Sequence, residues 1–167
     1  QPDFKWTQHS WYSYGRDDYD SEKTKELEIV SSTPDQFQRL GKYLGQALQT
    51  YQARYRTPNR IGYEKTGRIF IKHVSQVRFN RYGVGTKMRE HYDHIHSLFD
   101  GKLKGIPILS IVGLLNDNYE GGEFLIRREQ VKLARGDILI FPSNFMYPHE
   151  VKDITKGIRY SFVSWAF

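Results

Sequence analysis

The stretch that decides the fold covers residues 107–142 and reads PILSIVGLLNDNYEGGEFLIRREQVKLARGDILIFP. Segments rich in Ile, Leu, Val and Phe alternate in it with turn segments, NDNYEGG and ARGD, that carry Gly, Asn and Asp. Short apolar segments bounded by such turn residues are typical of antiparallel strands. The stretch therefore predicts strands over 107–116, 122–128, 130–134 and 137–142.

Strand-like patterns extend from this stretch in both directions. Aromatic residues make up 15% of the chain, which favours a β-rich protein. About eight short strands that follow a single helix argue for an antiparallel barrel or jelly roll rather than a series of βαβ units. The further predicted strands cover 4–14, 27–30, 68–82, 87–93, 147–153 and 157–167.

One helix is predicted over about 34–56. Thr33 suits the N-cap, Pro34 suits the first helical position, and Gln36 completes a capping box with Thr33. Pro58 ends the helical pattern. Apolar side chains recur at helical spacing, and we expect this stripe to pack against the sheet. The stripe consists of Phe37, Leu40, Leu44, Ala47, Leu48, Tyr51 and Tyr55.

The composition bounds the chemistry that the chain can carry. Its 167 residues suit a single domain, and the absence of cysteine excludes disulfides, Cys-ligated metals and a cysteine nucleophile. Any metal must therefore be bound by His, Asp or Glu. No apolar run approaches the roughly 20 residues that span a bilayer, and no secretory signal opens the chain. We therefore expect a soluble cytoplasmic protein without a membrane partner.

The charge balance is basic, with 25 Lys and Arg against 19 Asp and Glu, a formal net charge of +6. Such a balance permits an anionic partner such as nucleic acid. The charges are spread along the whole chain, however, and a solvated basic surface explains them as well. The residues 15–26 (GRDDYDSEKTKE) form the most strongly charged segment, which predicts a loop.

The segment His-Tyr-Asp-His-Ile-His is the strongest candidate for a metal site. Alternate side chains of a strand share a face, so His91 and Asp93 point the same way. His149 lies far downstream in another strand-like segment, YPHEVKD. Two His and one carboxylate make the facial triad of non-haem Fe(II) oxygenases, which keeps positions open for a cosubstrate and O₂. An H-x-D tripeptide alone is a weak signal, and His94 and His96 compete as ligands.

Arg159 follows His149 by ten residues and opens the last predicted strand, GIRYSFVSW. Facing strands of a barrel would place its guanidinium in the barrel mouth, near the metal. A buried Arg is costly without an anionic partner. A dicarboxylate cosubstrate would supply that partner through bidentate hydrogen bonds. An ordinary ion pair, at the surface or structural, is the alternative role for Arg159.

Five pieces together resemble the Fe(II)/2-oxoglutarate-dependent dioxygenase superfamily, and within it the small stand-alone prolyl 4-hydroxylases. They are VRFNRYGVG before HYD, then LLNDNYEGGEF, GDILIFPS, HEV and GIRYSFVSW. Their order and spacing are specific, and they lie within residues 76–167. Residues 1–75 resemble the family only through a strand–loop–helix arrangement. The resemblance implies a single mainly β domain, a double-stranded β-helix (jelly roll) core over 76–167 preceded by the supporting helix.

The resemblance also implies roles for individual residues. His91, Asp93 and His149 would ligate Fe(II), and Arg159 would bind the distal carboxylate of 2-oxoglutarate. Tyr82 in the R-Y-x-x-G piece would contact the cosubstrate.

Four further positions concern the pocket wall and departures from the family pattern. Trp165 would lie near the wall. Many relatives carry a Tyr where this chain has Met88, and some carry one that reaches the cosubstrate where it has Leu114. Ser110 is the substitute that we predict for the missing contact.

The implied activity is hydroxylation of prolyl residues at the 4-position in a protein or peptide, with succinate and CO₂ as coproducts. Fe(II) would be the metal, 2-oxoglutarate the cosubstrate and ascorbate an optional reductant. An extended proline-containing peptide needs an open groove, and aromatic side chains suit such peptides. The loop 15–26 could close over the peptide as a lid, and a plain surface loop is the equal alternative.

Three alternative functions stay in view. Nucleic-acid dealkylating dioxygenases typically carry a second Arg six residues beyond the cosubstrate Arg, and Trp165 at that position argues against a nucleic-acid substrate. An oxygenase acting on a free amino acid or another small molecule is compatible with the same motifs. A non-enzymatic jelly-roll binding module would keep the barrel without the metal, and the presence of all the site residues argues against it.

Overall fold

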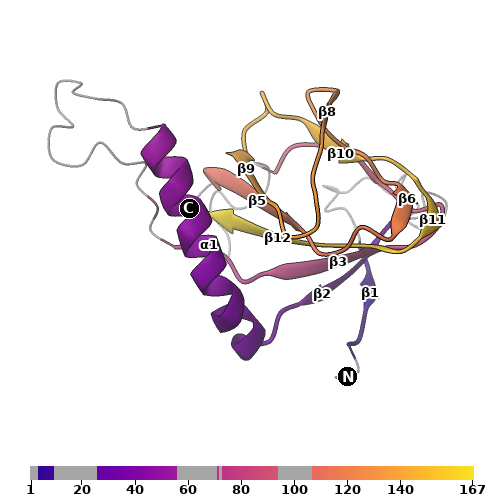
Figure 1. The fold of residues 1–167 in the computed structure, drawn as a ribbon, viewed down its shortest axis with the longest axis horizontal. Coiled ribbons are helices and arrows are strands. Elements are labelled where there is room, and N and C mark those ends of the chain that lie inside the picture. Colours follow the sequence, from indigo (N-terminus) through magenta and orange to yellow (C-terminus); the bar gives the residue numbers. More distant parts are fainter. Residues whose placement is uncertain (1–3, 10–25, 56–70, 72, 94–106) are drawn as a thin grey trace, which may run out of the picture.

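The computed structural model describes residues 4–9, 26–55, 71, 73–93 and 107–167. In this described part, one helix accompanies three antiparallel sheets (Figure 1). The architecture is the mainly β jelly roll that the sequence predicts.

The largest sheet has six strands. In spatial order they are β1 (Thr7–Gln8), β2 (Glu28–Ser31), β3 (Arg78–Tyr82), β12 (Arg159–Ala166), β5 (Leu109–Leu114) and β9 (Ile138–Pro142). The second sheet contains β4 (Met88–His91), β10 (His149–Val151), β7 (Phe124–Ile126) and β8 (Glu129–Val131). The third sheet is the pair β11 (Ile154–Gly157) and β6 (Tyr119–Gly121).

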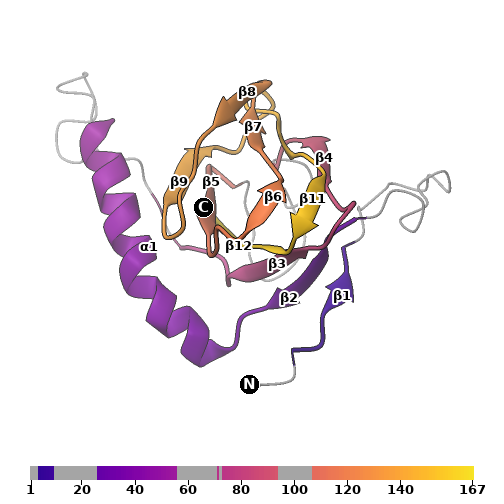
Figure 2. The same cartoon turned by 45° about the vertical axis from the view of Figure 1, so that its right-hand side comes forward.

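The helix α1 (Pro34–Arg54) forms where the sequence predicts it, with Tyr55 as its C-cap. The capping box is present, because the Thr33 side chain accepts a hydrogen bond from Gln36 N and the Gln36 side chain accepts one from Thr33 N. Such an N-cap is worth about 1 kcal/mol. Figure 2 shows α1 running along the outside of the barrel. Its buried residues, Leu44 and Leu48, pack on the outer face of the six-stranded sheet, as the stripe predicts.

The strand β12 lies between β3 and β5, and its side chains alternate between two environments. Phe162 and Ala166 face outward into the cluster with α1. Gly113 is the β5 partner of Phe162, and a Cβ there would overlap the Phe162 ring. The glycine therefore makes room for the aromatic ring in this cluster.

A second apolar cluster fills the inside of the barrel between the six-stranded and four-stranded sheets. Tyr82 and Phe141 contribute to it from one side, and Phe124 and Val151 from the other. Arg159 and Ser161 of β12 also face inward, beside this cluster. The barrel interior is therefore partly apolar core and partly polar pocket.

The structure corrects one strand prediction. The segment NDNYEGG, which the sequence suggests is a turn, contains β6, and β6 pairs with β11, a strand that the sequence does not predict. Backbone hydrogen bonds between segments far apart in sequence make this pair, and local composition does not reveal it. Of the segment 68–82, predicted as one strand or two, the described residues form β3 from Arg78 and an isolated bridge between Val74 and Ala166.

Other predictions concern glycines and loops. Gly136 has a positive φ of 95°, as expected for the turn that it occupies, and Gly121, the last residue of β6, has one of 76°. Residues 15–25 of the predicted lid at 15–26 lie outside the described residues, as do His94 and His96. Glu26, the last residue of that segment, is buried and forms an isolated bridge to Lys87.

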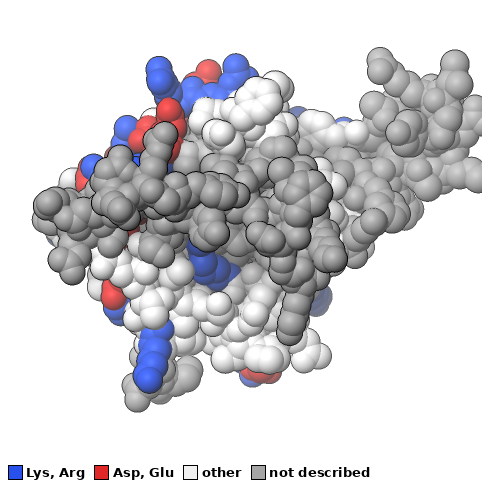
Figure 3. Space-filling view, turned by 180° about the vertical axis from the view of Figure 1, so that it is seen from behind, with Lys and Arg blue, Asp and Glu red and all other residues white. Residues whose placement is uncertain are grey.

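Charges and polarity of the surface bear on possible partners. No helix in the described part combines the length and the apolar character that crossing a bilayer requires. Figure 3 shows acidic side chains lying next to basic ones on the face that it displays, rather than one continuous basic patch. On this face, the described residues resemble an ordinary mixed surface.

Candidate metal centre

Three potential metal ligands converge in a pocket inside the barrel. The strands β4 and β10 are hydrogen-bonded neighbours, and His91 is the register partner of His149. Asp93 follows just after the end of β4. Its carboxylate oxygens lie 3.5 Å from His91 Nε2 and 3.7 Å from His149 Nε2. One potential ligand atom from each residue lies within 4.8 Å of the other two, so the three could hold a single ion.

Both imidazoles are oriented in the same way, by a hydrogen bond to the backbone carbonyl two residues earlier in the chain. His91 Nδ1 lies 2.8 Å from the carbonyl oxygen of Arg89, and His149 Nδ1 lies 3.1 Å from that of Tyr147. A carbonyl only accepts, so each Nδ1 carries the proton and each Nε2 is left with a lone pair. Backbone contacts of this kind fix the tautomer and the ring direction of metal-binding histidines.

The protonation states suit cation binding. Burial, with the His91 ring nearby, lowers the pKa of His149 to about 4, so this imidazole is neutral at pH 7. Burial pushes the pKa of Asp93 upward, but the neighbouring His91, His149 and Ser110 outweigh it and hold the pKa below its usual range. The cluster therefore presents a neutral His149 nitrogen and an anionic Asp93 carboxylate, with the His91 ring beside them. Such a set with open positions is typical of non-haem Fe(II) oxygenases.

The Asp93 carboxylate is held from β5 by serine. Ser110 Oγ donates a hydrogen bond of 2.5 Å to Asp93 Oδ2 and lies 2.9 Å from Ser143 Oγ. Because Ser110 gives its proton to the carboxylate, Ser143 is the donor in the second bond. The predicted cosubstrate contact of Ser110 stays a prediction, and the contact that the structure shows is with Asp93.

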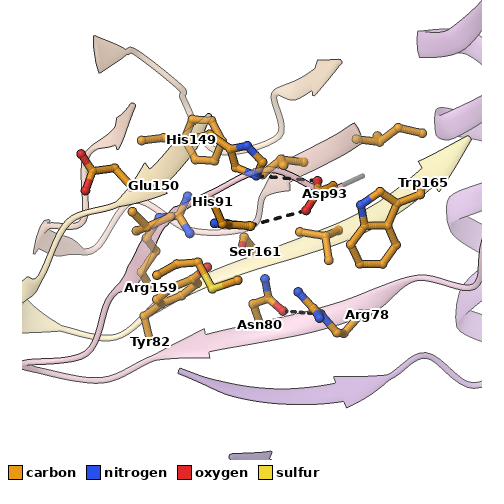
Figure 4. Close-up of a pocket in the computed structure, with 16 residues that line it drawn as sticks. Arg78, Asn80, Tyr82, His91, Asp93, His149, Glu150, Arg159, Ser161 and Trp165 are labelled. Carbon is orange, nitrogen blue, oxygen red and sulfur yellow. Dashed lines mark hydrogen bonds and ion pairs between the residues drawn. The ribbon is translucent and has the colours of Figure 1, made fainter. Parts of the chain in front are cut away.

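Arg159 and Tyr82 form one side of the pocket (Figure 4). Arg159 is 1% exposed, and its Nε and Nη1 have no hydrogen-bond partner among the described residues. Its guanidinium carbon lies 5.1 Å from the centre of the Tyr82 ring, which gives a cation–π contact but no negative charge. A buried guanidinium with two unused donors is suited to a carboxylate ligand.

Trp165 and Arg78 form the opposite side of the pocket (Figure 4). Trp165 lines the pocket, and its predicted contact with the cosubstrate stays a prediction. Arg78 and Asn80 were not predicted as site residues, and both point inward from β3 together with Tyr82. The signal that could have found them is the period-2 spacing of positions 78, 80 and 82. Met88, where relatives carry a Tyr, is buried at the inner edge of the pocket.

Sequence comparison relates most of the described barrel to a known family. Residues 77–167, more than half of the chain, match the model of the 2OG-Fe(II) oxygenase superfamily. A PKHD-type hydroxylase of Methylobacterium nodulans is 34% identical over 95 residues, which are 53% of this chain and 41% of that protein. The chain thus spans about two fifths of the length of the curated relatives it matches.

Solved structures share the fold. A prolyl-4-hydroxylase of Pseudomonas putida is similar with a TM-score of 0.61 and 21% identity, over 87% of this chain and 73% of that one. A prolyl hydroxylase of Trichoplax adhaerens, in complex with a hypoxia inducible factor oxygen degradation domain peptide fragment, is similar with a TM-score of 0.59 and 22% identity. That similarity covers 86% of this chain and 64% of the other.

Proposed function

The chain belongs to the 2OG-Fe(II) oxygenase superfamily, and from that premise we propose that it hydroxylates prolyl residues at the 4-position in a protein or peptide. In this reaction a substrate C–H becomes C–OH with one atom of O₂, while the second atom enters the succinate formed from 2-oxoglutarate as CO₂ leaves. Fe(II) is the metal, 2-oxoglutarate the cosubstrate and ascorbate an optional reductant.

The observation that carries the proposal is the cluster of His91, Asp93 and His149 beside the unpartnered guanidinium of Arg159. The two Nε2 lone pairs and the carboxylate fit a divalent iron, which supplies the redox chemistry when bound. The buried Arg159 donors fit the distal carboxylate of 2-oxoglutarate. Tyr82 covers one side of the guanidinium and limits access of water to it.

The prolyl substrate is supported by similarity. The Methylobacterium nodulans relative carries the name of a hydroxylase, and both structural neighbours are prolyl hydroxylases, one of them with a bound peptide. Trp165 adds a half-buried aromatic surface on the pocket wall, which suits a proline ring.

Anaerobic titration with Fe(II) and 2-oxoglutarate tests the oxygenase part. The wild-type protein should develop the weak metal-to-ligand charge-transfer band of the chelate, and the His149→Ala protein should not. The matched control is His73→Ala, which removes a half-buried imidazole that stacks on Phe167 and does not line the pocket. If the wild-type protein gives no band, or if His149→Ala gives the same band, the oxygenase proposal is wrong.

Mass spectrometry of proline-containing peptides after aerobic turnover tests the prolyl part. The expected product carries one additional oxygen on C4 of proline, in equal amount to the succinate released. Succinate release with no change in any proline peptide would retain the oxygenase and reject the prolyl substrate.

A further inference from the structure

The strand β3 carries two arginines that point to opposite faces of the six-stranded sheet. Arg81 points outward, where its Nη2 lies 2.7 Å from Glu28 Oε2 and its guanidinium covers the Trp6 ring. Arg78 points inward and lines the pocket that holds the candidate metal ligands. No carboxylate of the described residues forms an ion pair with Arg78, so only the outward arginine is neutralised by the fold.

The contacts of Arg78 hold its guanidinium in place without compensating its charge. Its Nε donates a hydrogen bond of 3.2 Å to Asn80 Oδ1, and its guanidinium carbon lies 5.3 Å from the centre of the Trp165 ring. Both partners are neutral. Burial lowers the pKa of Arg78, against the opposing effect of Tyr82 and Asp93. An arginine nevertheless stays protonated in proteins, so the pocket contains a fixed positive charge.

The charges of the pocket leave room for one more anion. Among the described residues that line the pocket, Arg78 and Arg159 are positive, a divalent metal would add two charges, and Asp93 is the carboxylate that faces them. Glu150 also lines the pocket, but its carboxylate lies 2.8 Å from Lys152 Nζ and is already paired. The two carboxylates of 2-oxoglutarate and that of Asp93 together do not balance the positive charge of the two arginines and a divalent metal. One further negative group would balance it.

Arg78 lies on the side of the pocket opposite to Arg159, where we propose that the distal carboxylate of 2-oxoglutarate binds. Figure 4 shows Arg159 with Tyr82 at one side of the His–Asp–His cluster, and Arg78 with Trp165 at the other. Arg159 has its own unused donors for the cosubstrate carboxylate. Resting on the proposed function, we propose that Arg78 binds a carboxylate of the primary substrate and selects substrates with a negative charge next to the hydroxylated carbon.

The carboxylate could come from two sources with the same chemistry. One is the side chain of an Asp or Glu adjacent to the target proline in a peptide. The other is the α-carboxylate of a C-terminal or free proline. A planar guanidinium binds either with a pair of parallel hydrogen bonds.

Three peptides of equal length, labelled at the N-terminus for fluorescence anisotropy, test the proposal. The first has Glu next to an internal proline and an amidated end, the second has Gln in place of Glu, and the third has a free C-terminal proline. Binding is measured to protein loaded anaerobically with Fe(II) and 2-oxoglutarate. One carboxylate peptide should bind on the order of tenfold more tightly than the Gln peptide, and which one does so identifies the source.

Variants assign this preference to Arg78. Arg78→Gln should remove it while retaining the charge-transfer band, and Arg78→Lys should retain part of it, since a point charge remains. Arg81→Gln is the matched control, because it removes a guanidinium from the other face of the same strand, and it should keep the full preference. If Arg78→Gln does not fold, the severalfold loss expected for Arg78→Lys carries the comparison.

Several results would overturn the inference. They are a wild-type protein without any preference for a carboxylate, an unchanged preference in Arg78→Gln and Arg78→Lys, and a loss of 2-oxoglutarate affinity in Arg78→Gln as large as in an Arg159 variant. In these cases the wild-type charge-transfer band remains, so the proposed function stands. A wild-type protein with no band would refute the proposed function and this inference together.

Discussion

The two faces of the six-stranded sheet differ sharply, although the same strands build both. The outer face of β3 and β12 presents Phe79, Phe162 and Ala166 to the helix α1. The inner face of the same two strands presents Arg78, Asn80, Tyr82, Arg159, Ser161 and Trp165 to the pocket. Neighbouring residues of one strand therefore have different roles: the outward side chains pack against the helix, and the inward side chains line the pocket.

This difference shows how the protein keeps a charged pocket without losing its fold. The helix supplies an apolar partner for the outer face, so the inner face does not need to be a complete hydrophobic core. Because side chains alternate strictly, a register shift of one residue would turn Arg159 to the outer face of the sheet and Phe162 into the pocket. We therefore expect outward substitutions to lower stability, and inward ones to lower ligand binding.

Phe162→Ala should give the largest effect, on stability. The Phe162 side chain is buried against Gly113 and the apolar cluster that includes Leu44 and Leu48 of α1. Its removal leaves a cavity in this cluster. We expect the free energy of unfolding to fall by about 3–5 kcal/mol, measured by urea denaturation. Any protein that stays folded should retain the Fe(II)–2-oxoglutarate charge-transfer band.

Val163→Ala is the control from the adjacent, inward-facing position. Val163 is half-buried and lines the pocket, so its truncation should cost only about 1 kcal/mol. Equal losses of stability at the two positions would contradict the division between the faces.

The sequence predicted the parts of the fold that local chemistry determines. Thr33 and Gln36 mark the start of α1 through a capping box, and the outcome matches. The pairing of β6 with β11 depends on backbone groups more than 30 residues apart, so no local pattern reports it.

The same distinction applies to the site. Strand alternation predicts that His91 and Asp93 share a face, the resemblance to the family adds His149 as the third ligand, and the structure brings the three together. The role of Ser110 depends on which carboxylate meets its hydroxyl across the barrel, and the inward direction of Arg78 on the register of β3. Both are tertiary facts that residue type alone does not determine.

Arg159→Met should have the next largest effect, on cosubstrate binding. It replaces a buried, unpaired guanidinium with an apolar side chain of similar length. We expect the affinity for 2-oxoglutarate to fall on the order of 100-fold, measured by titration of the charge-transfer band. Without 2-oxoglutarate, the free energy of unfolding should not fall, because an unpaired buried charge is costly.

Arg81→Met is the matched control, since it removes an arginine from the outer face of the sheet. It should leave the affinity for 2-oxoglutarate unchanged. A large loss of stability in Arg159→Met, with normal binding of 2-oxoglutarate, would show that Arg159 stabilises the fold and does not bind the cosubstrate.

Ser110→Ala should have the smallest effect, on metal binding alone. Ser110 donates to Asp93 Oδ2, and contacts that orient a ligating carboxylate are typically worth 10–100-fold in metal affinity. We expect Fe(II) affinity to fall about tenfold, while 2-oxoglutarate affinity at saturating iron stays unchanged. The control is Ser164→Ala, a buried serine bonded to Ser75 rather than to the pocket, which should cost stability and leave iron binding intact. A loss of 2-oxoglutarate affinity with normal iron binding would instead favour the cosubstrate contact that the sequence predicts for Ser110. In that case β5, like β3 and β12, would contribute a ligand-binding residue on the inner face of the sheet.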